Sequence, residues 1–237
     1  MGKRIIGIGF LLFLLGLVGE GPLLTGLVRK NLTAALVREA RVAEEVQLEI
    51  APLGLRDLLS GQVGAFRLTA ARFGFKEGPV FTDVSLQSEG MHFDPDALLR
   101  GKFVLRALKE TVMNLELPEG ELTTMMRQDL PELEPTIFLE ENRVELEGFL
   151  DLFGQGRLPF RASARLEKAS GDSLRLLPLG LEVAGVPLWA ELFQKYVPKL
   201  SWEFPLAIPW PVRLAHFQVK PGVIEMEWRE RGEEVSE

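Results

Sequence analysis

Metal-binding residue types alternate at one place in the sequence, as His92, Asp94 and Asp96. Imidazole and carboxylate groups are common metal ligands, so this spacing resembles a metal cluster. The helix signals around it give a simpler explanation, because Asp94 stands directly before Pro95 and can cap a helix that starts there. Asp96 then lies in the first turn, where a negative charge suits the helix dipole. We therefore predict a capped helix here, and no metal or cofactor site.

Other residues could support catalysis only with partners that the sequence does not supply. His216 has no obvious partner, and the sequence lacks the Gly-x-Ser-x-Gly turn that presents the nucleophilic serine of many hydrolases. Acid–base chemistry by two carboxylates requires burial that separates their pKa values, whereas charges beside prolines usually face solvent. The carboxylates in question are Glu132, Glu134, Glu140 and Glu141. We predict that the protein is not an enzyme.

Aromatic and methionine side chains indicate a different kind of site. All four tryptophans follow residue 188, and Met125 and Met126 lie on an amphipathic segment. Such side chains suit a deformable apolar surface, and tryptophan favours the boundary between water and an apolar phase. They form either the core of the last helix and strands or the wall of a lipid-binding cavity. The candidate lipid-contacting residues are Leu27, Leu32, Leu36, Met125, Met126, Trp189, Phe193, Tyr196, Trp202 and Trp210.

The composition excludes several classes of function. The net charge is −7 and no basic stripe is present, which argues against a nucleic-acid partner and against binding to anionic lipid by overall charge. The chain has no cysteine, which excludes disulfides, thiolate metal sites, a cysteine nucleophile and an acylated cysteine anchor. Any contact with lipid must therefore be apolar or local.

Residues 1–21 have the pattern of a targeting segment. Lys3 and Arg4 precede an uncharged apolar run over residues 5–19, which Glu20 ends. This is typical of a signal peptide and is short for a membrane-spanning helix, which needs about 20 apolar residues. No good cleavage site follows, so residues 5–19 could also remain as an anchor in the inner membrane. In both cases we expect export, to the periplasm or another extracytoplasmic space.

Two periodicities predict the elements of the exported part. From Pro22 to about Glu45, apolar residues recur at helical spacing, which predicts one long helix. After Val46 the apolar residues alternate with polar ones, which predicts strands with one wet and one dry face. Strands of this kind belong to antiparallel sheets. The clearest lie at residues 46–51, 66–71, 144–152, 158–167 and 224–229.

Short helices interrupt these strands. They are expected at residues 55–59, 94–99, 119–130 and 186–197. The first two belong to similar Leu-Leu-x-Gly units that end at Gly61 and Gly101. No long flexible linker is present, so we predict one α+β domain over residues 22–230, followed by a disordered acidic tail over 231–237. The predicted fold is a curved, mostly antiparallel sheet packed against the long N-terminal helix and the short helices.

Several short motifs follow one another in a recognisable order. An export segment and a helix lead into a first strand, and a leucine-rich turn at residues 53–63 ends in glycine and Gln-Val. The later motifs are a strand at 83–93, a Leu-Leu-x-Gly unit at 94–101, a helix at 121–126, a Leu-Pro-Leu element at 177–179 and a hairpin around 220–223. This order resembles the bacterial LmeA-like phospholipid-binding family over most of residues 22–229.

The resemblance implies an envelope protein that binds phospholipid and influences lipid or glycolipid trafficking. It also implies a curved antiparallel sheet wrapped against helices, similar to tubular lipid-binding domains. The strand pattern agrees, because strands dry on one face and an apolar helix can enclose a groove for acyl chains. The same pattern also fits an extracytoplasmic scaffold with a solid core and no ligand. The two hypotheses differ in whether a cavity on the order of several hundred Å³ opens near residues 189–210.

Overall fold

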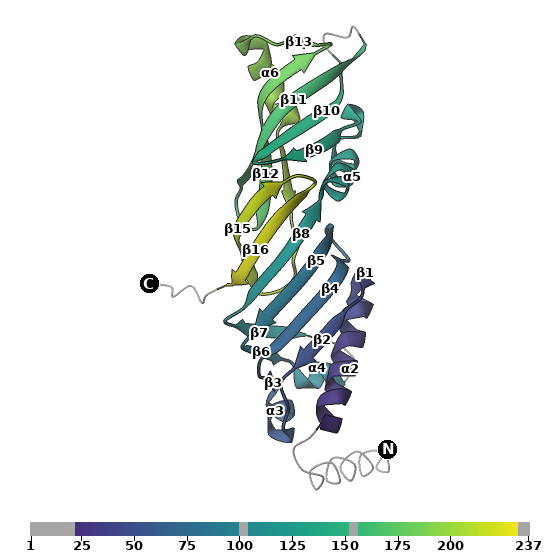
Figure 1. Ribbon diagram of the computed structural model, residues 1–237, viewed down its shortest axis with the longest axis vertical. Helices are drawn as coiled ribbons and strands as arrows, with labels where there is room; N and C mark the ends of the chain where they lie inside the picture. The colour runs from purple at the N-terminus through teal and green to yellow at the C-terminus, as the bar shows by residue number, and fades with distance from the viewer. Residues whose placement is uncertain (1–21, 100–103, 152–155, 232–237) are drawn as a thin grey trace, which may run out of the picture.

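The computed structural model describes residues 22–99, 104–151 and 156–231, and these form an elongated molecule (Figure 1). Antiparallel sheets make up most of it, with a few short helices around them. Among the described residues, no helix combines the length and the apolarity needed to cross a membrane. The predicted targeting segment, residues 1–21, lies outside the described residues, as does the tail after Arg231.

The largest sheet has seven strands and forms the half of the molecule that carries the N-terminal helix (Figure 1). Its strands are β1 (Ala40–Glu44), β2 (Gln47–Ile50), β4 (Phe66–Phe75), β5 (Val80–Ser88), β8 (Val112–Pro118), β15 (Val212–Lys220) and β16 (Val223–Glu230). They lie in the order β1-β4-β5-β8-β16-β15, and β2 also pairs with β4. Every pairing in this sheet is antiparallel, as the alternation of apolar and polar residues predicts.

Two smaller sheets complete the strand structure. The six-stranded sheet contains β9 (Thr136–Glu140), β10 (Arg143–Asp151), β11 (Arg157–Lys168), β12 (Ser173–Val183), β13 (Val186–Pro187) and β14 (Trp202–Pro205). The three-stranded sheet contains β3 (Gln62–Val63), β6 (Gly90–Phe93) and β7 (Leu105–Lys109). Where one curved sheet was expected, the described chain forms three.

Buried hydroxyl groups mark the place where β5 gives way to β6 and the smallest sheet begins. The hydroxyls of Ser88 and Thr111 lie 2.8 Å apart and are hydrogen-bonded to each other. The Ser88 hydroxyl lies 2.8 Å from the carbonyl oxygens of both Gly90 and Lys109, and its single proton can be donated to either of them. Together with the bond from Glu89 N–H to the Lys109 carbonyl at 3.1 Å, these side-chain bonds hold the backbone at the bend.

The helices are short, and two of them begin or end where the sequence did not predict. They are α2 (Pro22–Glu39), α3 (Leu55–Ser60), α4 (Pro95–Leu99), α5 (Glu119–Asp129), α6 (Ala190–Leu200) and a 3₁₀ turn, η1 (Pro131–Leu133). The prediction that the first helix extends to about Glu45 was wrong, because β1 pairs there with the end of β4. The helix expected from residue 186 begins at Ala190, since β13 first pairs with β12. Tertiary pairing overrides local helix propensity at both places.

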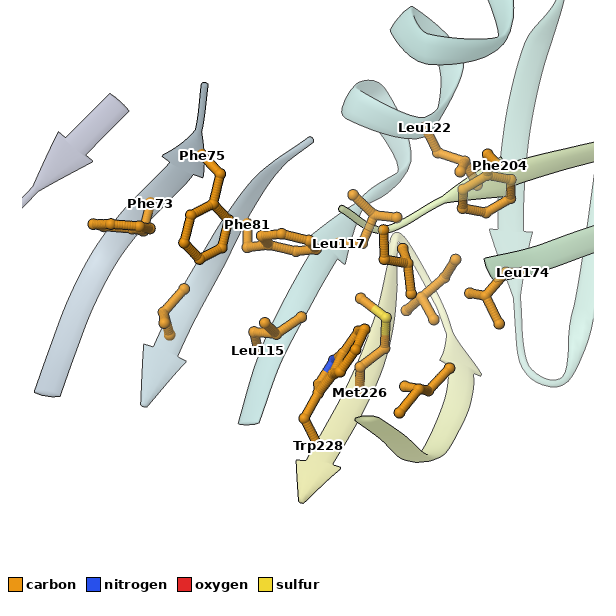
Figure 2. Close-up of a cluster of buried hydrophobic side chains, with 14 of the residues drawn as sticks. Phe73, Phe75, Phe81, Leu115, Leu117, Leu122, Leu174, Phe204, Met226 and Trp228 are labelled. Carbon is orange, nitrogen blue, oxygen red and sulfur yellow. The ribbon is translucent and has the colours of Figure 1, made fainter. Parts of the chain in front are cut away.

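The dry faces of the strands form one continuous apolar core. Figure 2 shows it passing from Phe73 and Phe75 on β4, through Phe81 and Trp228, to Phe204 on β14. The polar faces carry ion pairs along the ladders instead, such as Arg72–Glu44 at 2.8 Å. Exposed pairs of this kind contribute little to stability, so burial of the apolar faces is what holds the sheets together.

The predicted helix cap at Asp94 is confirmed. Its Oδ1 accepts a hydrogen bond from the backbone N–H of Ala97 at 3.0 Å, and its Oδ2 forms an ion pair with Arg106 at 2.7 Å. The Ala97 N–H, followed by Arg106, lowers the pKa of the Asp94 carboxyl. The second residue of the helix, Asp96, lies in the first turn as expected.

We expect Asp94→Ala to destabilise the protein at neutral pH and to lose that effect in acid. The pKa of Asp94 is lower in the folded protein than in the unfolded chain. The ionised carboxylate therefore stabilises the folded protein fully at pH values above the usual carboxyl pKa of about 4, and this stabilisation is lost as the pH falls through the lowered pKa. Urea unfolding of the wild type and the variant, at a series of pH values between 7 and 3, measures the difference. Asp96→Ala, which removes a carboxylate from the same turn, is the control. A difference independent of pH would contradict the role of the carboxylate charge.

Candidate functional site

An apolar groove opens to solvent between the end of α2 and the end of β4 in the seven-stranded sheet, with a volume of about 650 Å³. We name it the α2 groove. Four pieces of chain enclose it: the end of α2, the end of β4 with the turn that follows, the start of β7, and the segment between β14 and β15. Its lining residues are Leu36, Phe73, Phe75, Lys76, Glu77, Val104, Leu105, Ala207, Ile208, Pro209 and Trp210.

A narrow crevice continues from the α2 groove beneath α2, and it has about 20 Å³ of free volume. The groove and the crevice share Leu36, Leu105 and Trp210, so these side chains stand at the passage between them. Every residue that lines the crevice is apolar: Leu32, Leu36, Leu48, Phe66, Leu68, Leu86, Met91, Leu105, Leu108 and Trp210. The crevice is too narrow for a ligand as it stands, but its lining extends the apolar surface of the groove inward.

Three aromatic rings form one wall of the α2 groove. The ring of Trp210 meets Phe75 edge to face at 5.1 Å between centroids and lies 6.3 Å from Phe73. Phe73 and Phe75 themselves meet edge to face at 5.2 Å. The segment that carries Trp210 is held at both ends, since Leu206 N–H donates to the Asp172 carbonyl and Arg231 N–H donates to the Pro211 carbonyl. The wall is therefore preorganised and apolar, with the geometry that aromatic pairs favour.

Polar groups in the lining of the α2 groove come from the turn after β4. There Lys76 and Glu77 place one ammonium and one carboxylate beside the aromatic wall. A mostly apolar pocket with a few polar groups is the usual form of a site for a small amphipathic ligand.

The comparison with protein-family models identifies the relationship. The model described as LmeA-like phospholipid-binding matches residues 22–227. The chain belongs to this family. No curated protein and no solved structure matches the chain. The matched range of the LmeA-like phospholipid-binding model includes the whole lining of the α2 groove as well as the six-stranded sheet.

Three of the ten candidate lipid-contacting residues come together at the α2 groove and its crevice. Leu32 and Leu36 reach it from α2, and Trp210 reaches it from the segment before β15. Leu27 lies on α2 as well, but its side chain is outside those that the structure describes. Of the candidates whose side chains the structure describes, Leu32, Leu36 and Trp210 are therefore the ones that line the groove or its crevice, in a chain of a phospholipid-binding family.

The other six candidates lie in the half of the molecule formed by the six-stranded sheet. Met126, Tyr196 and Trp202 are buried in the core, while Met125 and Phe193 pack against it. The indole of Trp202 stacks on Phe204 at 4.4 Å and donates to the Asp129 carboxylate at 2.9 Å. The side chain of Trp189 differs from all of these because 67% of its surface is exposed.

Sequence patterns did not reveal several residues that line the α2 groove. Phe73 and Phe75 alternate at the end of β4, which indicates a buried face but no ligand site. Leu105 and Ile208 come from segments about 100 residues apart that meet only in the folded chain. Neither His92 nor His216 lines the groove. Within the described parts of the chain, no three histidine, aspartate or glutamate side chains gather where they could hold a metal ion.

Proposed function

We propose that the protein binds phospholipid in the α2 groove, outside the cytoplasm and close to a membrane, and passes it on without chemical change. The α2 groove is the observation that carries this proposal: an apolar pocket of about 650 Å³, open to solvent, in a chain of a phospholipid-binding family. Ligand pockets generally have volumes of roughly 300–1,000 Å³, so the groove accommodates an acyl chain or part of one.

The binding free energy comes mainly from the acyl chain. Each methylene that leaves water for an apolar surface contributes roughly 0.8 kcal/mol, and the aromatic wall offers such a surface without rearrangement. The headgroup then lies toward the turn after β4, where the ammonium of Lys76 lines the groove and carries a charge of opposite sign to a phosphate. The narrow crevice beneath α2 has room for more of the chain only if α2 moves away from the sheet.

The proposed location rests on the first residues of the chain. Lys3, Arg4 and the apolar run over residues 5–19 form a targeting or anchoring segment that stands directly before α2. Leu36 follows Pro22 by 14 positions, which corresponds to about 21 Å along a helix. A retained segment would therefore keep the α2 groove within a short distance of its membrane.

Native mass spectrometry of the purified protein, together with uptake of a fluorescent phospholipid, tests the proposal. We expect a bound lipid that organic extraction removes, and an uptake that unlabelled phospholipid displaces. If the protein carries no lipid and takes up none, the scaffold alternative gains support instead. The filled core in Figure 2 is the observation that favours that alternative, because most of the interior already holds side chains.

A further inference from the structure

Among the described residues, Val186 and Trp189 expose large apolar side chains at the end of the molecule farthest from α2 and α3. This end is formed by β13, by the turn that joins it to β12, and by the start of α6 (Figure 1). Val186 on β13 is 63% exposed, and Trp189, directly before α6, is 67% exposed. We name residues 184–189 the Trp189 tip. A tryptophan so exposed contrasts with Trp202 and Trp228, which are buried.

The Trp189 tip is held in place by the backbone around it. Val186 pairs with Val183 across the β12–β13 turn, and Leu188 N–H donates to the Leu181 carbonyl at 2.9 Å. After Trp189, α6 is fixed on the core by Tyr196 and Leu200, which are buried. The apolar side chains therefore project from a fixed support and are not the result of a frayed end.

The charges of the chain segment that carries the Trp189 tip cancel. Residues 182–200 contain two carboxylates, Glu182 and Glu191, and two ammonium groups, Lys195 and Lys199. The chain as a whole has a net charge of −7, which opposes approach to an anionic surface. The segment that carries the tip adds no net charge of its own, so its contact with an anionic lipid surface depends on apolar groups.

The size of the Trp189 tip decides what it can bind. A stable protein–protein interface buries about 800 Å² on each partner, whereas two side chains offer only a few hundred Å² at most. A bilayer accepts such a small projection, since tryptophan is favoured at the boundary between lipid headgroups and acyl chains. We propose that the Trp189 tip docks on a phospholipid bilayer by inserting Trp189 and Val186 at its surface.

This inference rests on the proposed function in one respect, since a lipid-binding protein must meet the bilayer that supplies or receives its lipid. The tip and the α2 groove lie in different halves of the elongated molecule (Figure 1). Docking through the tip therefore leaves α2, and any membrane segment before it, unobstructed.

Quenching of tryptophan fluorescence by brominated phospholipid tests docking on the full chain. The chain is mixed with vesicles of phosphatidylcholine and phosphatidylglycerol whose acyl chains are ordinary or brominated. The emission of Trp189 is the difference between the wild type and Trp189→Phe, and that of Trp210 is obtained in the same way with Trp210→Phe. We expect brominated vesicles to quench the Trp189 emission at least about twofold, in low and high salt alike, because the contact is apolar.

Two surface variants complete the docking test. With Val186→Ser, half-maximal quenching of the Trp189 emission should require a roughly tenfold higher lipid concentration, as the loss of one inserted side chain predicts. Leu59→Ser, a control at the opposite end with a side chain that is 65% exposed, should leave it unchanged. Because all these side chains are exposed, the variants are expected to fold.

The outcomes separate the two proposals. Trp189 emission that brominated lipid does not change overturns docking through the tip, and the phospholipid site still stands if Trp210 is quenched. Quenching of Trp189 without quenching of Trp210 supports docking and contradicts a lipid site in the α2 groove. A dimer in solution that Trp189→Ala converts to a monomer, with no quenching of Trp189 by vesicles, would assign the tip to a second copy of the chain and overturn the proposal.

Discussion

Replacing Leu36 by glutamate is expected to weaken phospholipid binding roughly thirtyfold, which corresponds to the contact of two to three methylenes at about 0.8 kcal/mol each. Leu36 lines both the α2 groove and the crevice beneath it, so its side chain stands where an acyl chain would pass. A carboxylate at this point would have to lose water without gaining a partner whenever an acyl chain enters, and this penalty opposes binding directly.

The neighbouring residue provides the matched control. Val37 belongs to the same turn of α2, is 42% exposed, and lines neither the groove nor the crevice. Val37→Glu therefore adds the same charge to the same helix without touching the site. Surface changes of this kind usually alter free energies by less than about 0.5 kcal/mol, so we expect a change in affinity below about twofold.

Titration of each variant with a fluorescent phospholipid measures the affinity, and thermal unfolding verifies that both variants fold. A third variant, Leu36→Met, keeps an apolar side chain of similar volume and should bind nearly as the wild type does. If Leu36→Glu and Val37→Glu both keep the affinity of the wild type, the lipid does not occupy the α2 groove. If both variants lose affinity by the same factor, the cause is repulsion by the added charge, and this result also contradicts the site.

The sequence predicted the strands well because their dry faces carry an unmistakable alternation. β10, β11 and β16 begin and end within one residue of the expected positions, and each buries one face. The end of α2 could not be predicted in this way. Its apolar spacing continues past Glu39, and what stops the helix is pairing of residues 40–44 with a strand about 30 residues later.

The candidate site depended on contacts that local sequence does not contain. Leu36 and Trp210 could be selected because each belongs to an apolar segment, but nothing in either segment indicates that the two meet. Trp202 was an equally reasonable candidate, and only the fold shows that its indole N–H is bonded to Asp129 inside the other half of the molecule. A cluster of aromatic residues in sequence therefore separated into a pocket wall, a core and an exposed tip.

Gly61→Ala is expected to reduce the free energy of unfolding by about 2–4 kcal/mol, through two effects that add. Gly61 has a φ of 69°, which disfavours any residue with a Cβ atom. A Cβ atom there would also lie 2.3 Å from the carbonyl oxygen of Phe93 and 3.0 Å from Cδ of Pro95. The close approach is fixed, because Phe93 N–H donates to the Gly61 carbonyl at 2.8 Å.

A second glycine separates backbone strain from the steric clash. Gly171 has nearly the same backbone conformation, with a φ of 65°, but a Cβ atom there would meet nothing within 4 Å. Gly171→Ala should therefore lose only the conformational part, about 1 kcal/mol. Urea unfolding of both variants gives the comparison, and the difference between them is the contribution of the contact with Phe93.

The position of Gly61 explains why a larger loss is expected there. The first Leu-Leu-x-Gly unit closes α3 with this glycine, and its backbone lies directly against the strand and proline that begin the second unit at α4. Phe93 belongs to β6, so a displacement of it would be transmitted to Met91 on the same strand and to Leu108 on β7, which pairs with Met91, and both line the crevice beneath α2. Gly61→Ala should therefore weaken lipid uptake as well as stability, while Gly171→Ala changes only stability. Equal unfolding free energies for the two variants would mean that the two units are not in the close contact described.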